Sequence, residues 1–300
     1  MAIDTSYLYF RAFYGMPASV RDAQGNPVNA VRGVLDSLAN LIRQHSPDLL
    51  ACAWDEDWRP AWRTELIPSY KAHRVANRDT EGKDSEEVPQ ELAVQVPVIK
   101  DVLASLGLPV MGVAGYEADD VLASLAARHE GTTLVVTGDR DLFQLIDPTT
   151  SVVNLAGSGG ASNLVDELEL FDRYQVQPDR YVDLAVLRGD PSDGLPGVKG
   201  VGDKTAARLI AEYDSLEALI ADAIDGSGTL SPALRRNLAA AADYVERARK
   251  VVLTVADLQL PAPTVLPVEV DPQLVARWRE DAGLGRSIDR IAVALAQRGE

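Results

Sequence analysis

The stretch that decides the fold runs from residue 109 to residue 141 and reads PVMGVAGYEADDVLASLAARHEGTTLVVTGDRD. It opens with a short apolar segment, PVMGV, and its second apolar segment, TTLVVTGD at 132–139, ends in an acid. Between them apolar residues recur at helical spacing, which predicts a helix beginning near Ala118. One acid is enough to cap a helix or complement its dipole. The first turn of this helix nevertheless holds three: Glu117, Asp119 and Asp120.

The same alternation of strand and helix continues toward the N-terminus. LLACAWD at 49–55 has the apolar run of a buried strand and ends in an acid, and residues 92–108 form an amphipathic helical pattern. SVVNLA at 151–156 is a further candidate strand. Strands that alternate with helices predict an α/β fold with a mostly parallel central sheet flanked by helices. Ligands of such sheets bind outside the carboxyl ends of the strands.

Composition and cysteine usage restrict the class of protein. Of 300 residues, 46% are hydrophobic and 25% charged, as in ordinary globular proteins. No run of 18 apolar residues and no secretory signal occurs, so we expect neither a membrane span nor export. The single cysteine, Cys52, excludes an intramolecular disulfide and, within LLACAW, is expected to be an inert core thiol of a cytoplasmic protein. Three scattered histidines make a zinc site improbable.

The net charge of −16 speaks, by itself, against a nucleic-acid partner. A protein that gathers carboxylates around bound divalent cations would escape this objection. The charge therefore has to be judged by where the acids lie.

Nine acids lie at or near the ends of predicted elements. They are Asp4, Asp55, Glu117, Asp119, Asp120, Asp139, Asp141, Asp190 and Asp193. Each by itself is explained as a turn or capping residue. Gathered at one sheet edge they would repel one another, unless hard divalent cations, which prefer oxygen ligands, compensate their charge. The joint pattern therefore favours a metal cluster, and two ions about 4 Å apart are suited to phosphoryl chemistry.

A glycine-rich turn follows at 197–206, GVKGVGDKTA, where the chain becomes mostly helical. Its spacing is that of a helix–hairpin–helix turn, whose backbone amides and helix N-terminus can bind a phosphate without reading bases. Lys199, Lys204 and Arg208 would add positive charge. The alternative is a packing turn between two helices.

A second basic stretch, RPAWRTELIPSYKAHR, covers residues 59–74. Trp58, directly before this stretch, and Trp62, within it, are expected to pack against the sheet. The charged segment 73–90 lacks apolar periodicity, which fits either a solvated surface loop or a mobile segment over the site. Phe10, on a predicted helix, is more easily explained as a core residue when only the sequence around it is considered.

Together these motifs resemble the 5′ nuclease family, which includes the 5′→3′ exonuclease domain of bacterial DNA polymerase I, phage 5′ exonucleases and flap endonucleases. The matching motifs occur in family order over about residues 1–220. They are Asp4 with Phe10-Arg11, SYKAHR, GYEADDVLASLA, TGDRDLFQLI and RGDPSDGLPGVKGVGDKTA.

The resemblance implies a structure-specific, divalent-metal-dependent 5′ nuclease that cleaves 5′ ends and 5′ flaps of nicked or branched duplex DNA in replication and repair. Two or three Mg²⁺ or Mn²⁺ ions are implied. Asp4, Asp55, Glu117 and Asp119 resemble ligands of the first ion, and Asp139, Asp141 and Asp193 resemble ligands of the second. Asp119 would reach both ions, while Asp120 and Asp190 would lie nearby or act through water.

The resemblance also implies roles for the basic and glycine-rich residues. Lys71, Arg74 and Arg11 correspond to basic catalytic residues at the scissile phosphate. Phe10 holds the position of an aromatic residue on which a terminal base stacks, and a helical arch is implied at 71–98. The duplex-binding turn, where K⁺ can bridge to phosphate, would use Gly197, Lys199, Gly200, Val201, Gly202, Lys204 and Thr205.

Three further expectations concern the organisation of the chain. We expect an α/β nuclease core at 1–188, a helix–hairpin–helix module at 189–250 and a helical region at 251–300 that packs on the core. With no polymerase domain in this sequence, we expect a stand-alone, monomeric nuclease. Only Met1–Ala2–Ile3 precede Asp4, where most relatives have a fuller strand, which would weaken that edge of the site. Ser192-Asp193-Gly194 stands where many bacterial relatives have Ser-Asp-Asn.

The DNA path requires a common basic face. We expect it to comprise Arg59, Arg63, Lys71, Arg74, Lys199, Lys204 and Arg208. Two alternatives stay open: a PIN-type ribonuclease, which shares acidic strand ends but lacks the helix–hairpin–helix turn, and a branched-DNA binder without catalytic turnover.

Overall fold

The computed structural model describes residues 1–78, 84–156, 163–226 and 228–297. Their contacts form two compact units, each described here by itself. The first comprises Met1–Glu56, Glu87–Gly138 and Ala256–Glu300, and the second Asp57–Glu86 and Asp139–Val255. This grouping differs from the consecutive ranges expected. Residues 57–86 and 139–188 belong with the helical module, while 256–300 belong with the sheet.

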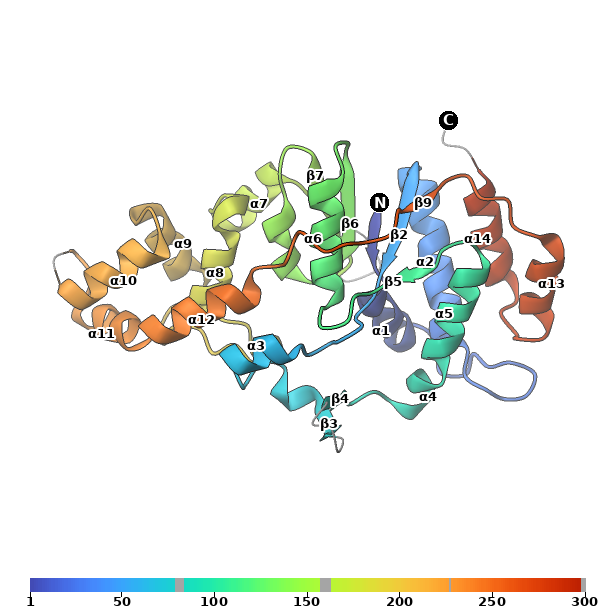
Figure 1. The fold of residues 1–300 in the computed structure, drawn as a ribbon, viewed down its shortest axis with the longest axis horizontal. Helices are drawn as coiled ribbons and strands as arrows, with labels where there is room; N and C mark the ends of the chain where they lie inside the picture. Colours follow the sequence, from blue (N-terminus) through green and yellow to red (C-terminus); the bar gives the residue numbers. More distant parts are fainter. Residues whose placement is uncertain (79–83, 157–162, 227, 298–300) are drawn as a thin grey trace. The chain divides into compact units, whose positions relative to one another are not determined.

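The first unit is built on parallel strands in the order β5–β2–β1–β6, with β9 antiparallel on β2 (Figure 1). The strands are β1 (Ala2–Asp4), β2 (Leu49–Ala53), β5 (Val110–Met111), β6 (Thr133–Thr137) and β9 (Thr264–Val265). Because the paired strands are parallel, their carboxyl ends share one edge of the sheet. Asp4 is the last residue of β1, and Asp55 and Glu117 come after the carboxyl ends of β2 and β5.

The central strand β1 is short but fully integrated. It pairs with β2 on one side and β6 on the other, with Ile3 opposite Cys52 and Val136. Ile3 is completely buried, and the Met1 ammonium donates to the Leu49 carbonyl at 2.8 Å. The expectation that the short lead-in weakens this edge is therefore wrong, because pairing on both sides holds the strand that carries Asp4.

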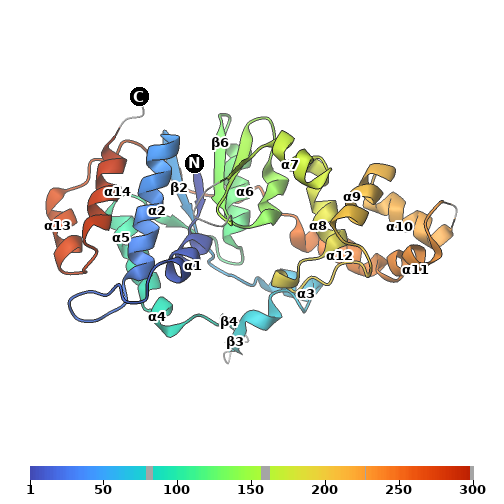
Figure 2. The same cartoon turned by 180° about the vertical axis from the view of Figure 1, so that it is seen from behind.

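Helices cover both faces of this sheet. α6 packs on β1, β2 and β6 on one face, and α1 and α2 lie on the other (Figures 1 and 2). α14 packs along α2, where the fully buried Ile288 and Ile291 face the unit's interior and Arg290 pairs with Asp36 at 2.6 Å. The helices are α1 (Thr5–Gly15), α2 (Asn29–His45), α4 (Gln90–Ala93), α5 (Gln95–Ser105), α6 (Ala118–Arg128), α13 (Pro272–Glu280) and α14 (Arg286–Ala296).

The second unit is mainly helical. The core of this unit lies around α8, whose residues Tyr181–Leu187 are buried and which packs against α9 and α12. Phe143, Tyr174 and Tyr181 form an aromatic cluster beside it, with centroids 5.5–6.0 Å apart. The helices are α3 (Ala61–Leu66), η1 (Ala72–Arg74), η2 (Arg140–Leu145), α7 (Glu167–Tyr174), η4 (Pro178–Arg180), α8 (Tyr181–Arg188), η5 (Pro191–Asp193), α9 (Asp203–Glu212), α10 (Leu216–Asp225), α11 (Pro232–Ala240) and α12 (Ala242–Val252). Two antiparallel hairpins complete it: β3 (Val75–Arg78) with β4 (Asp84–Glu86), and β7 (Thr150–Asn154) with β8 (Asn163–Val165).

Several expected elements are confirmed. β2, β5 and β6 lie within the predicted apolar segments, β7 begins one residue before its segment, and α6 begins at Ala118. Cys52 is 1% exposed, and burial raises the pKa of its thiol to about 12, as suits an inert core residue. No helix in the described ranges is long and apolar enough to span a bilayer.

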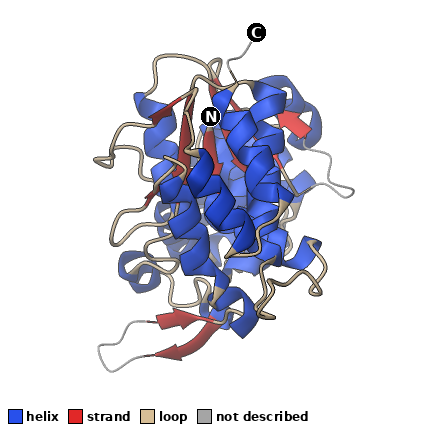
Figure 3. Cartoon of the chain, turned by 90° about the vertical axis from the view of Figure 1, so that its right-hand side faces the viewer, coloured by secondary structure: helices blue, strands red, loops and turns tan. Residues whose placement is uncertain are grey.

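The helical arch expected at 71–98 is wrong for its central part. β3 and β4 pair there as an antiparallel hairpin, with Val75 opposite Glu86 (Figure 3). The hairpin is anchored by an ion pair between Arg59 and Asp84, whose side chains are 6% and 9% exposed. Residues 79–83 lie outside the described residues. Among the described residues of this range, helix is found at its edges, in η1, α4 and the start of α5.

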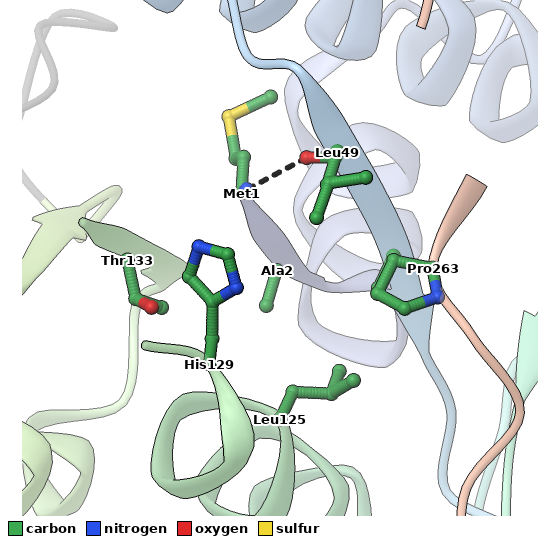
Figure 4. Close-up of a pocket in the computed structure, with 8 residues that line it drawn as sticks. Met1, Ala2, Leu49, Leu125, His129, Thr133 and Pro263 are labelled. Atoms are coloured by element: carbon green, nitrogen blue, oxygen red, sulfur yellow. Dashed lines mark hydrogen bonds between the residues drawn. The ribbon is translucent and has the colours of Figure 1, made fainter. Parts of the chain in front are cut away.

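A small cavity of about 50 Å³ lies at the amino edge of the first unit's sheet (Figure 4). Met1, Leu49, His129 and Thr133 are among its lining residues. Asp4 stands at the other end of β1. The cavity has room for little more than a water molecule and is not a nucleotide site.

Candidate active site

Asp4 is fixed by the ends of two strands and one helix of the first unit. It ends β1 and caps α1, its Oδ1 accepting from the Tyr7 N–H at 2.8 Å. Its Oδ2 accepts from the hydroxyl of Thr137, the last residue of β6, at 2.7 Å. Asp4 is 6% exposed and Thr137 fully buried. This carboxylate is thus held at the carboxyl edge of the sheet by donors that favour its ionised form.

Asp55 lies two residues beyond β2 at the same edge. Its Oδ1 accepts from the Ala118 N–H at 2.7 Å, and its own N–H donates to the Ser6 hydroxyl at 3.0 Å. The Asp55 carboxylate therefore satisfies an amide in the first turn of α6. These two bonds tie Asp55 to both helices that flank the sheet.

The three carboxylates at the start of α6 have different surroundings. Glu117 and Asp120 form a capping box, in which each side chain accepts from the other's backbone N–H. Glu117 is 1% exposed and Asp120 completely buried, whereas Asp119 is partly exposed. The Asp120 side chain therefore caps the N-terminus of α6, a role that differs from metal binding. Asp119 is the acid of this turn that is open to solvent.

The second unit carries a separate acidic group, defined as Asp139, Asp141, Asp190 and Asp193. Asp139 accepts from the Asp141 N–H at 2.8 Å, and Asp190 accepts from the Ser192 N–H at 2.8 Å, so each caps a short 3-10 helix. Burial, and then the charges of Asp139, Asp193 and Asp190, raise the pKa of Asp141 well above its ordinary value. The four carboxylates thus lie within electrostatic range of one another.

The expected basic catalytic residues of the second unit dock onto this group. Arg74 Nη2 lies 2.9 Å from Asp193 Oδ1 and donates to the Ser192 carbonyl at 2.6 Å. The Lys71 N–H donates to the Asp193 carbonyl at 2.9 Å, and Lys71 itself has φ +48°. The Arg74 guanidinium and the backbone of Lys71 thus lie against the segment that carries Asp193, although the two segments come from separate motifs.

Gly194 makes that docking possible. Its φ is +70°, and a Cβ there would lie 2.1 Å from the Ser69 carbonyl oxygen. The Ser69 hydroxyl donates to the Gly194 carbonyl at 2.8 Å. Glycine at this position therefore allows two backbone segments to meet.

The donor sets fit the divalent ions that the family implies. All are carboxylates, which hard cations prefer, and in the second unit burial, and then their mutual repulsion, raise the pKa of Asp141. Within the described ranges, no three acidic, histidine or cysteine side chains already form a complete metal-binding group. Mg²⁺ does not require one, because it keeps several waters and uses one or two carboxylates.

The glycine turn is closely packed and exposes its lysines. A Cβ on Gly189 would lie 2.4 Å from the Gly197 nitrogen, and the Gly197 N–H donates to Tyr244 Oη at 3.0 Å. Val201 is only 6% exposed, and its N–H donates to the Val198 carbonyl, so the expected contact of Val201 with DNA is wrong. Lys199, Gly200, Gly202 and Lys204 are exposed, and Thr205 is half-buried.

The common basic face is only partly present. Arg63 is 2% exposed and donates to the Val251 carbonyl at 3.1 Å, and Arg59 pairs with Asp84. Both therefore act within the fold and not on a DNA path. Arg208 is exposed but paired with Glu212 at 2.8 Å.

On α1 the structure gives Phe10 an intermediate environment. Phe10 is partly exposed, and its ring lies 4.8 Å from that of Tyr9, which in turn lies 5.3 Å from Trp54. Arg11 is also partly exposed. A half-exposed ring beside other aromatic side chains is compatible both with a core residue and with a surface on which a terminal base stacks.

Several residues that hold the acids in place were not predicted from the sequence. The Thr137 hydroxyl donates to Asp4, the Ser6 hydroxyl accepts from the Asp55 N–H, and the Arg188 guanidinium lies 3.9 Å from Asp141. Their only sequence signal is position: Thr137 ends a strand, and Arg188 directly precedes the glycine of RGDPSDG.

Family models match this chain in two adjoining parts. The model for the 5′-3′ exonuclease N-terminal resolvase-like domain matches residues 1–177, and the model for the 5′-3′ exonuclease C-terminal SAM fold matches residues 176–271. The chain belongs to the 5′-3′ exonuclease family. A 5′-3′ exonuclease of Streptomyces coelicolor is 50% identical over 98% of this chain and 99% of its own length. One of Mycobacterium tuberculosis is 44% identical over 98% and 96%.

This 5′-3′ exonuclease family member also resembles solved structures. The T5 D15 protein co-crystallised with metal ions covers 98% of both chains with a TM-score of 0.66 and 17% identity, which shows the fold. The α/β fold class and the family expected from the motifs are confirmed.

Proposed function

We propose that this chain is a structure-specific 5′ nuclease that hydrolyses phosphodiester bonds at 5′ ends and 5′ flaps of nicked or branched duplex DNA. One observation carries the proposal: Lys71 and Arg74 are docked against the acidic segment of Asp193. Cations that can bind a phosphate and carboxylates that can bind a metal are the two components that metal-assisted phosphoryl transfer needs at one place. We place this activity in DNA replication and repair, in the cytoplasm, by a monomer.

The acids divide into two candidate ligand sets. Asp4, Asp55, Glu117 and Asp119 would hold one Mg²⁺ or Mn²⁺, and Asp139, Asp141 and Asp193 another, with Asp120 and Asp190 in supporting positions and a third ion where substrate adds ligands. Such ions, when bound, supply an activated water and stabilise the charge that develops on phosphate oxygens. The Thr137 hydroxyl orients the Asp4 carboxylate, and the Ser6 hydroxyl holds the backbone of Asp55 by accepting from its N–H.

Lys71 and Arg74 act on the substrate phosphate. The Arg74 guanidinium, now paired with Asp193, can bind a phosphate oxygen bidentately once a metal ion neutralises that carboxylate. Arg11, on α1 of the first unit, is a further candidate phosphate-binding cation. Phe10 would stack on the terminal base beside the cleaved bond.

Duplex DNA would bind at the glycine turn. Lys199 and Lys204 are exposed beside Gly200 and Gly202, and α9 begins at Asp203 directly after them. Amides and a helix N-terminus bind phosphate without reading bases, so binding would be independent of sequence, with K⁺ as a candidate bridge. Arg59, Arg63 and Val201 are left out of this surface because they are buried.

A labelled 5′-flap duplex tests the proposal. We expect cleavage with Mg²⁺ or Mn²⁺ and none with EDTA. Asp139→Asn should abolish cleavage while duplex affinity stays nearly unchanged, and Asp172→Asn, on an exposed face of α7, should behave as wild type. Wild-type turnover by the Asp139 variant would refute the role of the second acidic group.

The same assay separates the alternatives. Duplex binding without any metal-dependent product would favour a non-catalytic binder. Cleavage of single-stranded RNA in preference to the DNA flap would favour a PIN-type ribonuclease.

A further inference from the structure

Arg188 is a buried cation that neither the metal sites nor the DNA surface includes. It ends α8, and its side chain is 9% exposed. Its Nε donates to the Gly189 carbonyl at 3.1 Å, its Nη1 lies 3.4 Å from Asp203 Oδ1, and its Nη2 lies 3.9 Å from Asp141 Oδ1. One guanidinium therefore stands between two carboxylates and one carbonyl.

These three partners belong to different parts of the second unit. Asp141 is a member of the second acidic group, 13% exposed in its side chain. Asp203 is the first residue of α9, directly after the exposed glycine turn, and its side chain is 59% exposed. Gly189 begins the loop that leads to Asp190 and Asp193. Arg188 is thus a direct link between candidate metal ligands and the start of the duplex-binding helix.

The backbone around this link is tightly packed. A Cβ on Gly197 would lie 2.3 Å from the Arg188 carbonyl oxygen, and one on Gly189 would lie 2.4 Å from the Gly197 nitrogen. The Val198 N–H also donates to the Leu187 carbonyl at 2.8 Å. The glycine turn cannot shift without moving the end of α8, because no space separates the two segments.

Neither ion pair of Arg188 is as short as a charge-assisted hydrogen bond. Charge-assisted N–H···O bonds usually measure about 2.7–2.9 Å, whereas these are 3.4 and 3.9 Å. A cation bound by Asp141 would weaken that carboxylate's hold on the guanidinium and let it close on Asp203. Fixing Asp203 would in turn order the N-terminus of α9, where a duplex phosphate would bind.

We propose that Arg188 is a positioning residue that couples divalent-metal binding at the second acidic group to duplex binding at the glycine turn. The inference rests on the proposed function, because it presupposes that both ligands bind. Coupling free energies of this kind usually correspond to about 5- to 150-fold changes in affinity. By reciprocity, the metal should tighten duplex binding by the same factor as the duplex tightens metal binding.

The test uses a dumbbell duplex, closed by a hairpin loop at each end, so that no 5′ end occupies the site. Duplex affinity is measured by fluorescence anisotropy with and without Mn²⁺, and Mn²⁺ affinity by electron paramagnetic resonance with and without duplex. We expect about 5-fold coupling or more in the full wild-type chain. Arg188→Met and Asp203→Asn should reduce it to about 1-fold.

Two further variants distinguish positioning from mere stability. Arg188→Lys keeps the buried charge, but its single ammonium cannot reach both carboxylates as the forked guanidinium does. Compared with Arg188→Met, it should therefore restore the melting temperature without restoring the coupling. Arg180→Met, at the other end of α8, removes a comparable ion pair with Asp183 at 2.7 Å and should leave the coupling as in wild type. If Arg188→Met does not fold, Asp203→Asn and Arg188→Lys decide.

The outcomes separate this inference from the proposed function. A wild-type chain that binds both ligands without coupling, or coupling that survives in Asp203→Asn and Arg188→Lys, overturns the role of Arg188 alone. Failure of the wild type to bind Mn²⁺ or any duplex overturns the proposed function and the inference together.

Discussion

Replacing Gly194 by alanine should separate the basic segment from the acidic group. Gly194 has φ +70°, and an added Cβ would lie 2.1 Å from the Ser69 carbonyl oxygen, where ordinary contact begins at 3.4 Å. The backbone at Ser69 must therefore withdraw by more than an ångström. Lys71 and Arg74 follow within five residues, so they should move with it.

The expected loss of stability has two parts. An alanine at positive φ costs about 1–2 kcal/mol. Withdrawal also breaks the hydrogen bonds from Ser69 Oγ to Gly194 O and from Lys71 N to Asp193 O, each worth about 0.5–1.5 kcal/mol. We expect a total loss of about 2–5 kcal/mol in the free energy of unfolding. Gly25→Ala is the matched control: its φ is +87° with nothing within 4 Å, so it should lose only the first part, about 1–2 kcal/mol.

Urea unfolding and single-turnover cleavage of a 5′-flap duplex measure the two consequences. A displacement of about 1 Å at a positioning group costs about 10²-fold in rate, which we expect for Gly194→Ala and not for Gly25→Ala. Gly194→Asn, which tolerates positive φ better than alanine, should nevertheless lose activity because it carries the same Cβ. Cleavage by Gly194→Ala at the wild-type rate, with a stability loss equal to that of Gly25→Ala, would refute the docking argument.

Three further predictions concern individual side chains. Thr137→Val removes the hydroxyl that donates a hydrogen bond to Asp4 and should cost about 1.5–3 kcal/mol of unfolding free energy without metal. The control is Thr133→Val on the same strand, which should cost nothing because its buried hydroxyl has no hydrogen-bond partner among the described residues. Equal losses in the two variants would contradict the role of Thr137. Burial, then Asp139, Asp193 and Asp190, raise the pKa of Asp141, so the metal-free protein should lose stability as pH rises from about 4 through that raised pKa. Asp141→Asn should remove this part of the slope in pH-dependent urea unfolding, and an identical slope in both proteins would contradict it. Arg63→Met should reduce stability by about 1–3 kcal/mol but leave the salt dependence of duplex binding unchanged. Lys199→Ala, in contrast, should reduce the slope of log affinity against log salt concentration by about one. A flatter salt dependence in Arg63→Met would show that Arg63 belongs to the DNA surface.

The order of strands and helices could be predicted because it depends on local patterns. TTLVVT and LLACA are apolar runs of strand length, and the residues from Ala118 follow a helical period, so β6, β2 and α6 appear where expected. Parallel strands then place Asp4, Asp55 and Glu117 along one sheet edge, which follows from topology and needs no side-chain detail. The acids of the second group were also predicted from their positions at element ends, and the family resemblance assigned them to a second ion.

Burial of the basic residues could not be predicted in the same way. Arg59 and Arg63 lie in a polar stretch that any sequence pattern would place on the surface. Arg63 is buried because a carbonyl on α12, nearly two hundred residues away, accepts its Nε–H, and Arg59 is covered because Asp84 pairs with it. The hairpin of β3 and β4 likewise depends on pairing between two short segments with no apolar alternation. Such contacts depend on long-range packing, which composition and spacing do not encode.

The start of α6 shows how far one local pattern can be interpreted. Three carboxylates in four residues exceed what a helix N-terminus requires, and this surplus indicated a metal site. In the structure Glu117 and Asp120 satisfy each other's backbone amides, so two of the three acids form one capping box, while Asp55 satisfies a further amide of the same turn. Of the three acids in this turn, Asp119 is therefore the one open to solvent. Its neighbours Glu117, Asp120 and Asp55 already have positions fixed by hydrogen bonds. A cation that binds here would meet oriented oxygens and require little reorganisation, which is the condition under which a few direct carboxylates hold a hydrated Mg²⁺.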